Sequence, residues 1–448
     1  MTERTTSTLT AQEWADGCAK GELGLEDTLS AHVAFAEQAD QAISAFVSLG
    51  GEPVQDQIER LQSQRHAGMP AGPLFGVPVG IKDIIDTVDF ATEYGSPIHA
   101  GRYAIADATL VRRLREAGAL ILGKTATTEF ATFHPAATRN PHALDRTPGG
   151  SSSGSAAAVA AGLVPVSIGS QTNGSVIRPA SFCGVYGFKP SFGLIPRTGM
   201  FEQSPSLDQV GLFARNLEDL ARVAQVIAGD DGADEASFGM AAHRFHDIAL
   251  QSPPVSPKFC FVRTPWWDRV EPSAQEAYLA FLELMGDEVE VLQLPSVVEQ
   301  AVEWQALVNE PELALALMSE WLHHRDGLSP AMQARLDKAH AIPAAEYLKA
   351  KRRMPHVRHA FDEFFDRYDA ILCPAALGVA PLGLESTGNP IMQTVWTLGG
   401  LPAVNLPLLQ GDAGLPLGVQ AVGAFRQDGR LLRSLRWLVS EFHKRVDS

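Results

Sequence analysis

Apolar and polar positions along the chain follow two patterns, the spacing of amphipathic helices and the short apolar runs of buried strands. Together they predict an α/β protein. Helical spacing dominates residues 1–65, where Thr10 and Glu13 form the pattern of a helix-capping box. Further along, short apolar runs between amphipathic segments predict buried strands that alternate with helices. We therefore expect one domain over 1–448, built on a mixed, largely parallel central sheet with helices on both faces.

The elements expected beyond the N-terminal helical region follow from the same two patterns of apolar and polar residues. Strands are expected at 77–81, 119–125, 163–168, 259–263, 288–294, 368–374 and 402–408, and helices at 107–119, 156–162, 216–227, 274–285 and 430–442. Residues 235–365 are expected to form a variable, helix-rich region of the same domain.

Charge and composition narrow the class of protein. The net charge is −16 and no long basic run is present, which argues against binding to nucleic acid or to an anionic membrane. No apolar stretch reaches the ~18 residues of a membrane span, and the start of the sequence does not resemble a signal peptide. The four cysteines are scattered without a CxxC pair, which argues against a zinc site. We therefore expect a cytoplasmic protein that uses no metal.

Two turns rich in serine and glycine, at 149–155 and 169–175, are the main candidates for chemistry. A small-residue helix and an apolar strand connect them. Such turns leave backbone N–H groups free to face a ligand and let a hydroxyl approach it, which suggests an acyl-transfer site. Lys82 ends an expected buried strand among isoleucines and valine. It would either extend to solvent or act as a desolvated base.

Other interpretations of these turns are weaker. Gly149 and Gly154 match the outer glycines of a phosphate-binding loop, but Ser155 stands where that loop needs lysine. Ser175 is not in a GxSxG turn, and the nearest histidines have no spacing that marks a Ser-His-Asp triad. No serine lies three residues before a lysine, so the SxxK motif of β-lactamases is absent.

The combination of Lys82, Ser151 and Ser175 resembles the amidase signature family. The similarity is carried by long motifs at 80–83, 123–125, 149–161, 170–190 and 396–405. This resemblance implies a Ser-cis-Ser-Lys triad with Ser175 as the nucleophile, Ser151 as the bridging serine after a cis peptide bond, and Lys82 as the base.

The same resemblance places the oxyanion against the backbone N–H groups of Thr172, Asn173, Gly174 and Ser175. The chain departs from the common family pattern at Gln171, where an acidic residue is frequent, and at Asn173, where glycine is. The triad chemistry should survive both changes, whereas substrate preference need not.

The sequence Gln-Thr-Asn-Gly-Ser-Val-Ile-Arg-Pro looks most similar to small-molecule bacterial amidases of the malonamidase type. In those enzymes the residues matching Arg178 and Ser170 hold a substrate carboxylate, which suits the fork of an arginine. The alternative is that Arg178 forms an internal ion pair. The remaining expected substrate-binding residues are Gln171, Gly150, Ser152, Phe130, His134 and Trp396.

The function that we expect is hydrolysis of the C–N bond of a small, carboxylate-bearing amide, without metal or organic cofactor. Two alternatives stay open. One is the glutaminase (A-type) subunit of a tRNA-dependent amidotransferase, which would need partner subunits. The other is an inactive binding protein on the same fold. The sequence does not name the oligomeric state, and a homodimer is kept as the expected assembly.

Overall fold

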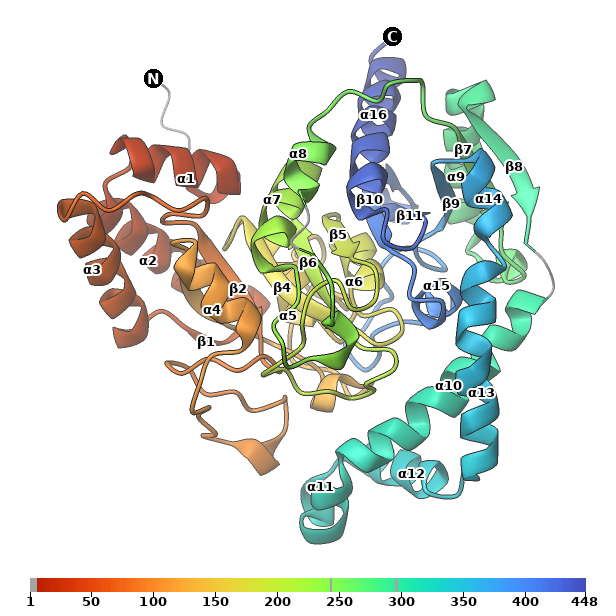
Figure 1. Ribbon diagram of the computed structural model, residues 1–448, viewed down its shortest axis with the longest axis horizontal. Coiled ribbons are helices and arrows are strands. Elements are labelled where there is room, and N and C mark those ends of the chain that lie inside the picture. The colour runs from red at the N-terminus through yellow and green to blue at the C-terminus, as the bar shows by residue number, and fades with distance from the viewer. Residues whose placement is uncertain (1–5, 242–243, 295–296) are drawn as a thin grey trace.

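The computed structural model describes residues 6–241, 244–294 and 297–448. Residues 1–5, on which part of the expectation about the N-terminus depends, lie outside them. The described residues form one eleven-stranded sheet that runs across Figure 1 in the order β1-β3-β2-β4-β6-β5-β10-β11-β9-β7-β8. The strands are β1 Phe46–Leu49, β2 Pro78–Lys82, β3 Leu120–Thr125, β4 Val166–Gln171, β5 Tyr186–Lys189, β6 Gln209–Ala214, β7 Phe259–Arg263, β8 Val289–Gln293, β9 Ala370–Pro374, β10 Ala403–Gln410 and β11 Pro416–Val422.

Helices cover both faces of this sheet, and the mixed α/β fold class is confirmed. The α-helices are α1 Ala11–Lys20, α2 Leu25–Ile43, α3 Glu52–His66, α4 Thr109–Glu116, α5 Ser153–Ala160, α6 Ile177–Phe182, α7 Leu217–Ile227, α8 Phe245–Ala249, α9 Pro272–Met285, α10 Val297–Ala316, α11 Met318–His323, α12 Pro330–Ala339, α13 Ala344–His359, α14 Asp362–Arg367, α15 Thr394–Leu398 and α16 Asp428–Val446. The interpretation as one domain stays a prediction.

The expectation of a largely parallel sheet is wrong. Four strand pairings are parallel, whereas six are antiparallel. The reason is that β5 leads to β6, and β10 to β11, without an intervening α-helix, so no crossover brings the second strand back in the same direction. The parallel pairings of β2 with β3 and β4 nevertheless place the ends of these three strands together, next to the serine-rich turns.

The N-terminal region contains a strand that helical spacing did not predict. The capping box of Thr10 and Glu13 is present, and α1, α2 and α3 follow as expected. Phe46–Leu49, however, forms β1 and pairs antiparallel with β3. A strand of four residues is too short to give a clear period-two pattern, which explains why it was missed.

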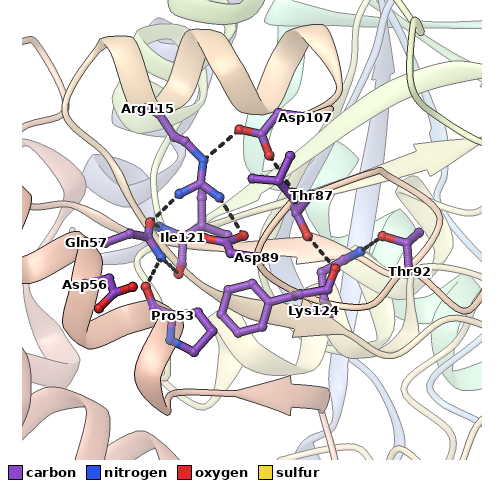
Figure 2. A network of polar contacts seen from close by, with 12 residues as sticks. Pro53, Asp56, Gln57, Thr87, Asp89, Thr92, Asp107, Arg115, Ile121 and Lys124 are labelled. Atoms are coloured by element: carbon purple, nitrogen blue, oxygen red, sulfur yellow. Dashed lines mark hydrogen bonds and ion pairs between the residues drawn. The ribbon is translucent and has the colours of Figure 1, made fainter. Parts of the chain in front are cut away.

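A polar network attaches α3 to the edge of the sheet where β1 ends (Figure 2). The Gln57 side chain accepts a hydrogen bond from Ile121 N–H at 2.9 Å and donates to Ile121 C=O at 3.0 Å, so it takes the place of a neighbouring strand. Arg115 donates to Gln57 Oε1 at 2.8 Å and to Asp89 at 2.7 Å. These bonds hold α3 and Arg115 against the edge of β3, the strand that pairs with β2.

The helix-rich region packs beside the sheet at one side of the molecule, where α10 and α13 lie side by side (Figure 1). Ser329, the N-cap of α12, donates its backbone N–H and its hydroxyl to the carboxylate of Glu129, at 2.9 and 2.5 Å. This contact ties α12 to the loop that follows β3. Within the described ranges, no helix combines the length and apolar content needed to cross a bilayer.

Candidate active site

Lys82 ends β2 in the interior of the molecule. Its side chain has no exposed surface, and its Nζ donates hydrogen bonds to Ser151 Oγ at 2.7 Å and to Ser170 Oγ at 2.9 Å. The sequence left open whether Lys82 extends to solvent, and the structure answers that it does not. Ser170 was expected to bind substrate, whereas here its hydroxyl contacts the lysine.

Burial lowers the pKa of Lys82 from 10.5 to about 7, because the charged ammonium loses its hydration. The carboxylate of Asp208 acts in the opposite direction and limits this fall in the pKa. Asp208 is itself buried, which raises its pKa to about 6, and it accepts a 2.5 Å hydrogen bond from Thr172 Oγ1. A substantial fraction of Lys82 is therefore neutral near pH 7 and able to accept a proton.

The loop before α5 presents Ser151 to the lysine. The peptide bond between Gly150 and Ser151 is cis. The loop is held on both sides of Ser151: Ser153 Oγ donates to Gly149 C=O at 2.7 Å, and Ser152 Oγ donates to Ser170 C=O at 3.1 Å. Ser152 was expected to bind substrate, but its hydroxyl is buried and joins α5 to β4 instead.

Gln171 supports the turn that carries Ser175. Its Oε1 accepts the backbone N–H groups of Val176 at 2.8 Å and Ile177 at 3.1 Å, and its Nε2 donates to Thr397 Oγ1 at 2.9 Å. The predicted role in substrate binding is therefore corrected, since both ends of the amide are engaged within the protein. A neutral amide suits this position because it both accepts and donates.

Helix α15 fixes the next residue of the turn. Thr397 Oγ1 donates to Asn173 C=O at 2.6 Å, and Thr394 Oγ1 donates to Asn173 Oδ1 at 2.8 Å. The backbone N–H groups of Thr172, Asn173, Gly174 and Ser175 donate no hydrogen bond within the described part of the protein. Unpaired backbone donors in a turn that is fixed in this way are the kind of group that can stabilise an oxyanion.

Ser175 is half-buried and lines a cavity of about 200 Å³. No hydrogen bond joins its hydroxyl to Ser151 among the described residues, although catalytic hydrogen bonds often tighten only when substrate is bound. The structure thus brings Lys82 and Ser151 into contact and leaves Ser175 facing the cavity.

Arg178 also lines this cavity, and it is a buried cation without a buried anion. It donates to Thr387 C=O and Gly150 C=O, both at 2.7 Å, while its Nη1 has no partner among the residues that the structure describes. Burial alone lowers its pKa from 12.5 to about 9. The alternative of an internal ion pair is wrong, since Arg178 contacts no carboxylate among the described residues. Gly150 was expected to bind substrate, but its carbonyl binds Arg178.

Three further predicted pocket residues do not line the cavity in the described part of the chain. Phe130 is fully buried and packs with Tyr94, His99 and Phe201. Trp396 is fully buried against Phe361, with ring centroids 4.8 Å apart. His134 is exposed. The two aromatic side chains are core residues because burial of their large apolar rings is more favourable there.

Part of the cavity lining comes from residues that the sequence analysis did not single out. They are Gln203 from the loop before β6, Val302, Gln305, Ala306, Asn309 and Glu310 from α10, and Arg335 from α12. A signal was available, because Gln305 continues the apolar stripe of Val298, Ala301 and Val308 and is buried with it. A buried amide within an apolar helix face indicates a polar neighbour or a ligand. No group of acidic, histidine or cysteine side chains within the described ranges could hold a metal ion.

Comparisons with known proteins agree with this geometry. The sequence model of the Amidase family matches residues 27–432. The A-type subunit of the glutamyl-tRNA(Gln) amidotransferase of Lachnospira eligens is 32% identical over 465 residues, which cover 95% of this chain and 96% of that protein. The corresponding protein of Moorella thermoacetica is also 32% identical and covers 98% of both chains.

Solved structures give the same result. One chain, from a vestigial protein complex that reveals the evolutionary origins of an s-triazine catabolic enzyme, superposes with a TM-score of 0.89 at 28% identity, covering 96% of this chain and 98% of that one. The peptide amidase PAM, in complex with the competitive inhibitor chymostatin, superposes with a TM-score of 0.84 at 27% identity, covering 98% of both. The chain therefore belongs to the amidase family and is a hydrolase acting on C–N bonds.

Proposed function

We propose that this protein hydrolyses a small, carboxylate-bearing amide through an acyl-enzyme formed on Ser175. The observation that carries the proposal is the buried contact between Lys82 and Ser151, beside a cavity that Ser175 lines. An amine with its pKa near 7, in contact with a hydroxyl, is suited to general-base catalysis at neutral pH.

The proposed proton path runs from Ser175 through Ser151 to neutral Lys82. As Ser151 gives its proton to Lys82 Nζ, it takes one from Ser175 Oγ, and Ser175 Oγ attacks the amide carbonyl carbon. Collapse of the tetrahedral intermediate breaks the C–N bond, and the proton returns from Lys82 through Ser151 to the leaving nitrogen. Water then attacks the acyl-enzyme by the same path and releases the acid.

The negative charge of the tetrahedral intermediate would lie against the backbone N–H groups of Thr172, Asn173, Gly174 and Ser175, which donate to no described residue. The turn that carries these donors is already fixed, because Gln171 and α15 hold it through hydrogen bonds. Each such donor typically contributes about 3–4 kcal/mol to transition-state stabilisation.

Arg178 supports the carboxylate as part of the substrate. A buried guanidinium with no anionic partner is unfavourable, and a carboxylate entering the cavity would supply the missing charge and a partner for Nη1. The cavity of about 200 Å³ is smaller than the range of roughly 300–1,000 Å³ that drug-sized ligands occupy, which favours a small molecule.

The test is release of ammonia by the purified chain from malonamate and succinamate, with propionamide as a neutral comparison. We expect the two anionic amides to be preferred and Ser175→Ala to abolish release from all three. Preference for propionamide would contradict the role of Arg178, and ammonia release by Ser175→Ala would contradict the nucleophile.

A second candidate is the glutaminase subunit of a tRNA-dependent amidotransferase, because the curated relatives named above are such subunits and align over nearly the whole chain. Glutamine distinguishes the two candidates. A glutaminase subunit would prefer glutamine to malonamate and depend on partner subunits, whereas the proposed amidase acts alone with the opposite preference.

A further inference from the structure

Part of the cavity lining is polar, and several buried polar atoms of the lining residues have no hydrogen-bond partner among the described residues. They are Gln203 Oε1, Gln305 Nε2 and Arg335 Nη1. Gln203 and Gln305 are only 4% and 5% exposed, so solvent hydrates little of either side chain. Buried polar atoms are nearly always satisfied by protein, ordered water or ligand. The cavity lining therefore offers hydrogen-bonding groups that the described residues leave unsatisfied.

Glu310 determines which of these polar atoms donate hydrogen bonds and which accept them. Its carboxylate accepts two 2.7 Å hydrogen bonds from Arg335 and a longer one, at 3.4 Å, from Asn309 Nδ2. Because a carboxylate only accepts, the amide nitrogen of Asn309 must face it, which turns Asn309 Oδ1 toward Gln203. Gln203 Nε2 donates to that oxygen at 3.0 Å. Gln203 Oε1 is consequently left as the free acceptor.

The other two free atoms are donors. Gln305 contributes Nε2 from α10, and Arg335 contributes Nη1 from α12 while its remaining guanidinium nitrogens are held by Glu310. Since Glu310 neutralises Arg335, this part of the lining differs from Arg178, whose cation is uncompensated. Arg178 thus suits an anion, whereas the group of Gln203, Gln305 and Arg335 suits a neutral group that both donates and accepts.

We propose that Gln203, Gln305 and Arg335 form a specificity subsite for a second, uncut amide group of the substrate. This inference rests on the proposed function, and it narrows the substrate to a carboxylate-bearing compound with two amide groups. The N–H of the second amide donates to Gln203 Oε1, and its C=O accepts from Gln305 Nε2 or Arg335 Nη1. An apolar group leaves all three atoms unpaired, and a second carboxylate opposes the Gln203 oxygen.

The experiment compares three pairs of amides whose members differ only in an acetamido group. The pairs are malonamate with 2-acetamidomalonamate, succinamate with N-acetylasparagine, and glutaramate with N-acetylglutamine. We expect the acetamido member of at least one pair to have a kcat/KM roughly tenfold or more above that of its parent. Replacing the acetamido group by acetoxy, which lacks the N–H, should remove most of that advantage.

Gln203→Met and Gln305→Met test the assigned residues in that pair. Each variant should lower the ratio of the two kcat/KM values by roughly fivefold or more, whereas Gln251→Met, a matched change of an exposed glutamine, should leave the ratio as in the wild type. Thermal unfolding of all three variants checks that the fold is kept. Because the readout is a ratio, a general loss of activity does not mimic the effect.

The outcomes separate the two proposals. Hydrolysis of the parents with no advantage for any acetamido compound would overturn the subsite and leave the proposed function standing. An advantage that persists in both glutamine variants would overturn the assignment of these residues. Absence of ammonia from all six compounds would contradict the proposed function, and the subsite with it.

Discussion

The amine nitrogen of Lys82 lies 2.7 Å from the hydroxyl oxygen of Ser151, at a point with no access to solvent. The two residues are far apart in the sequence and come from the end of β2 and the loop before α5. In this setting a lysine is destabilised as a cation and favoured as a neutral base. The relationship makes the chemistry of the site depend on the protonation of one amine.

The first prediction concerns pH. Lys82 has a pKa of about 7 and must be neutral to accept a proton, so kcat/KM should rise with pH through about 7 and fall as the pH drops below it. Lys82→Met should lose on the order of 10³-fold in kcat without melting at a lower temperature, since it removes a desolvated amine. A pH–rate profile from ~5.5 to ~9 checks this. Activity that stays level down to pH ~5.5, or a fully active Lys82→Met, would exclude Lys82 as the base.

The second prediction concerns Asp208. Its negative charge raises the pKa of Lys82, and it is ionised above about pH 6. Asp208→Asn should therefore lower the pKa of Lys82 and move the acid limb of the pH–rate profile to lower pH. Asp219→Asn, which changes another buried carboxylate that binds the start of α1, should leave the limb in place. A shift to higher pH in Asp208→Asn would contradict the assignment.

The third prediction concerns Gln171. Gln171→Ala leaves the backbone N–H groups of Val176 and Ile177 without their acceptor, so the turn at Ser175 should loosen. Loss of a buried hydrogen-bond partner typically costs about 1–3 kcal/mol, and we therefore expect kcat to fall by about 10- to 100-fold. Gln171→Glu keeps that acceptor but loses the bond to Thr397 and adds a buried carboxylate, and its kcat should fall less than that of Gln171→Ala. Steady-state kinetics give both values. Equal losses in the two variants would show that the N–H acceptor is not what matters.

The fourth prediction concerns Arg178. Arg178→Met removes the cation from the cavity. Removing one partner of a buried charge pair typically costs about 2–5 kcal/mol of binding free energy, so kcat/KM for malonamate should fall by about 100-fold or more. Propionamide, which has no carboxylate, should lose less, and that loss reports the bonds of Arg178 to Gly150 and Thr387. If both substrates lose activity to the same extent, Arg178 supports the loop and does not bind a carboxylate.

The periodicity of the sequence predicted those parts of the fold whose elements are long or strongly amphipathic. The capping box at Thr10, the strand that ends at Lys82 and the helix that Asn216 caps were all visible in local patterns. The strands β5, β6 and β11 were not predicted, because they are mostly buried and glycine interrupts each of them, so none shows a clear alternation of apolar and polar residues. Their antiparallel pairing depends on contacts between distant segments, which a local pattern does not contain.

The candidate site was predictable where long motifs carry it, and not where tertiary packing decides. The motifs named Lys82 and Ser151, and the structure places them in contact. They did not reveal that Gln171 faces the protein interior, since that depends on where Thr397 lies. Nor did they reveal the cavity wall from α10 and α12, because their placement follows from contacts such as the one between Glu129 and Ser329.

Covalent labelling with a fluorophosphonate, followed by intact-mass measurement and peptide mapping, tests the catalytic assignment without any knowledge of the substrate. We expect one label per chain, on Ser175, and much slower labelling of Lys82→Met and of Ser151→Ala at the same pH. A label on another residue, or a fully active preparation that takes up none, would contradict the conclusion that Lys82, Ser151 and Ser175 act as one catalytic unit.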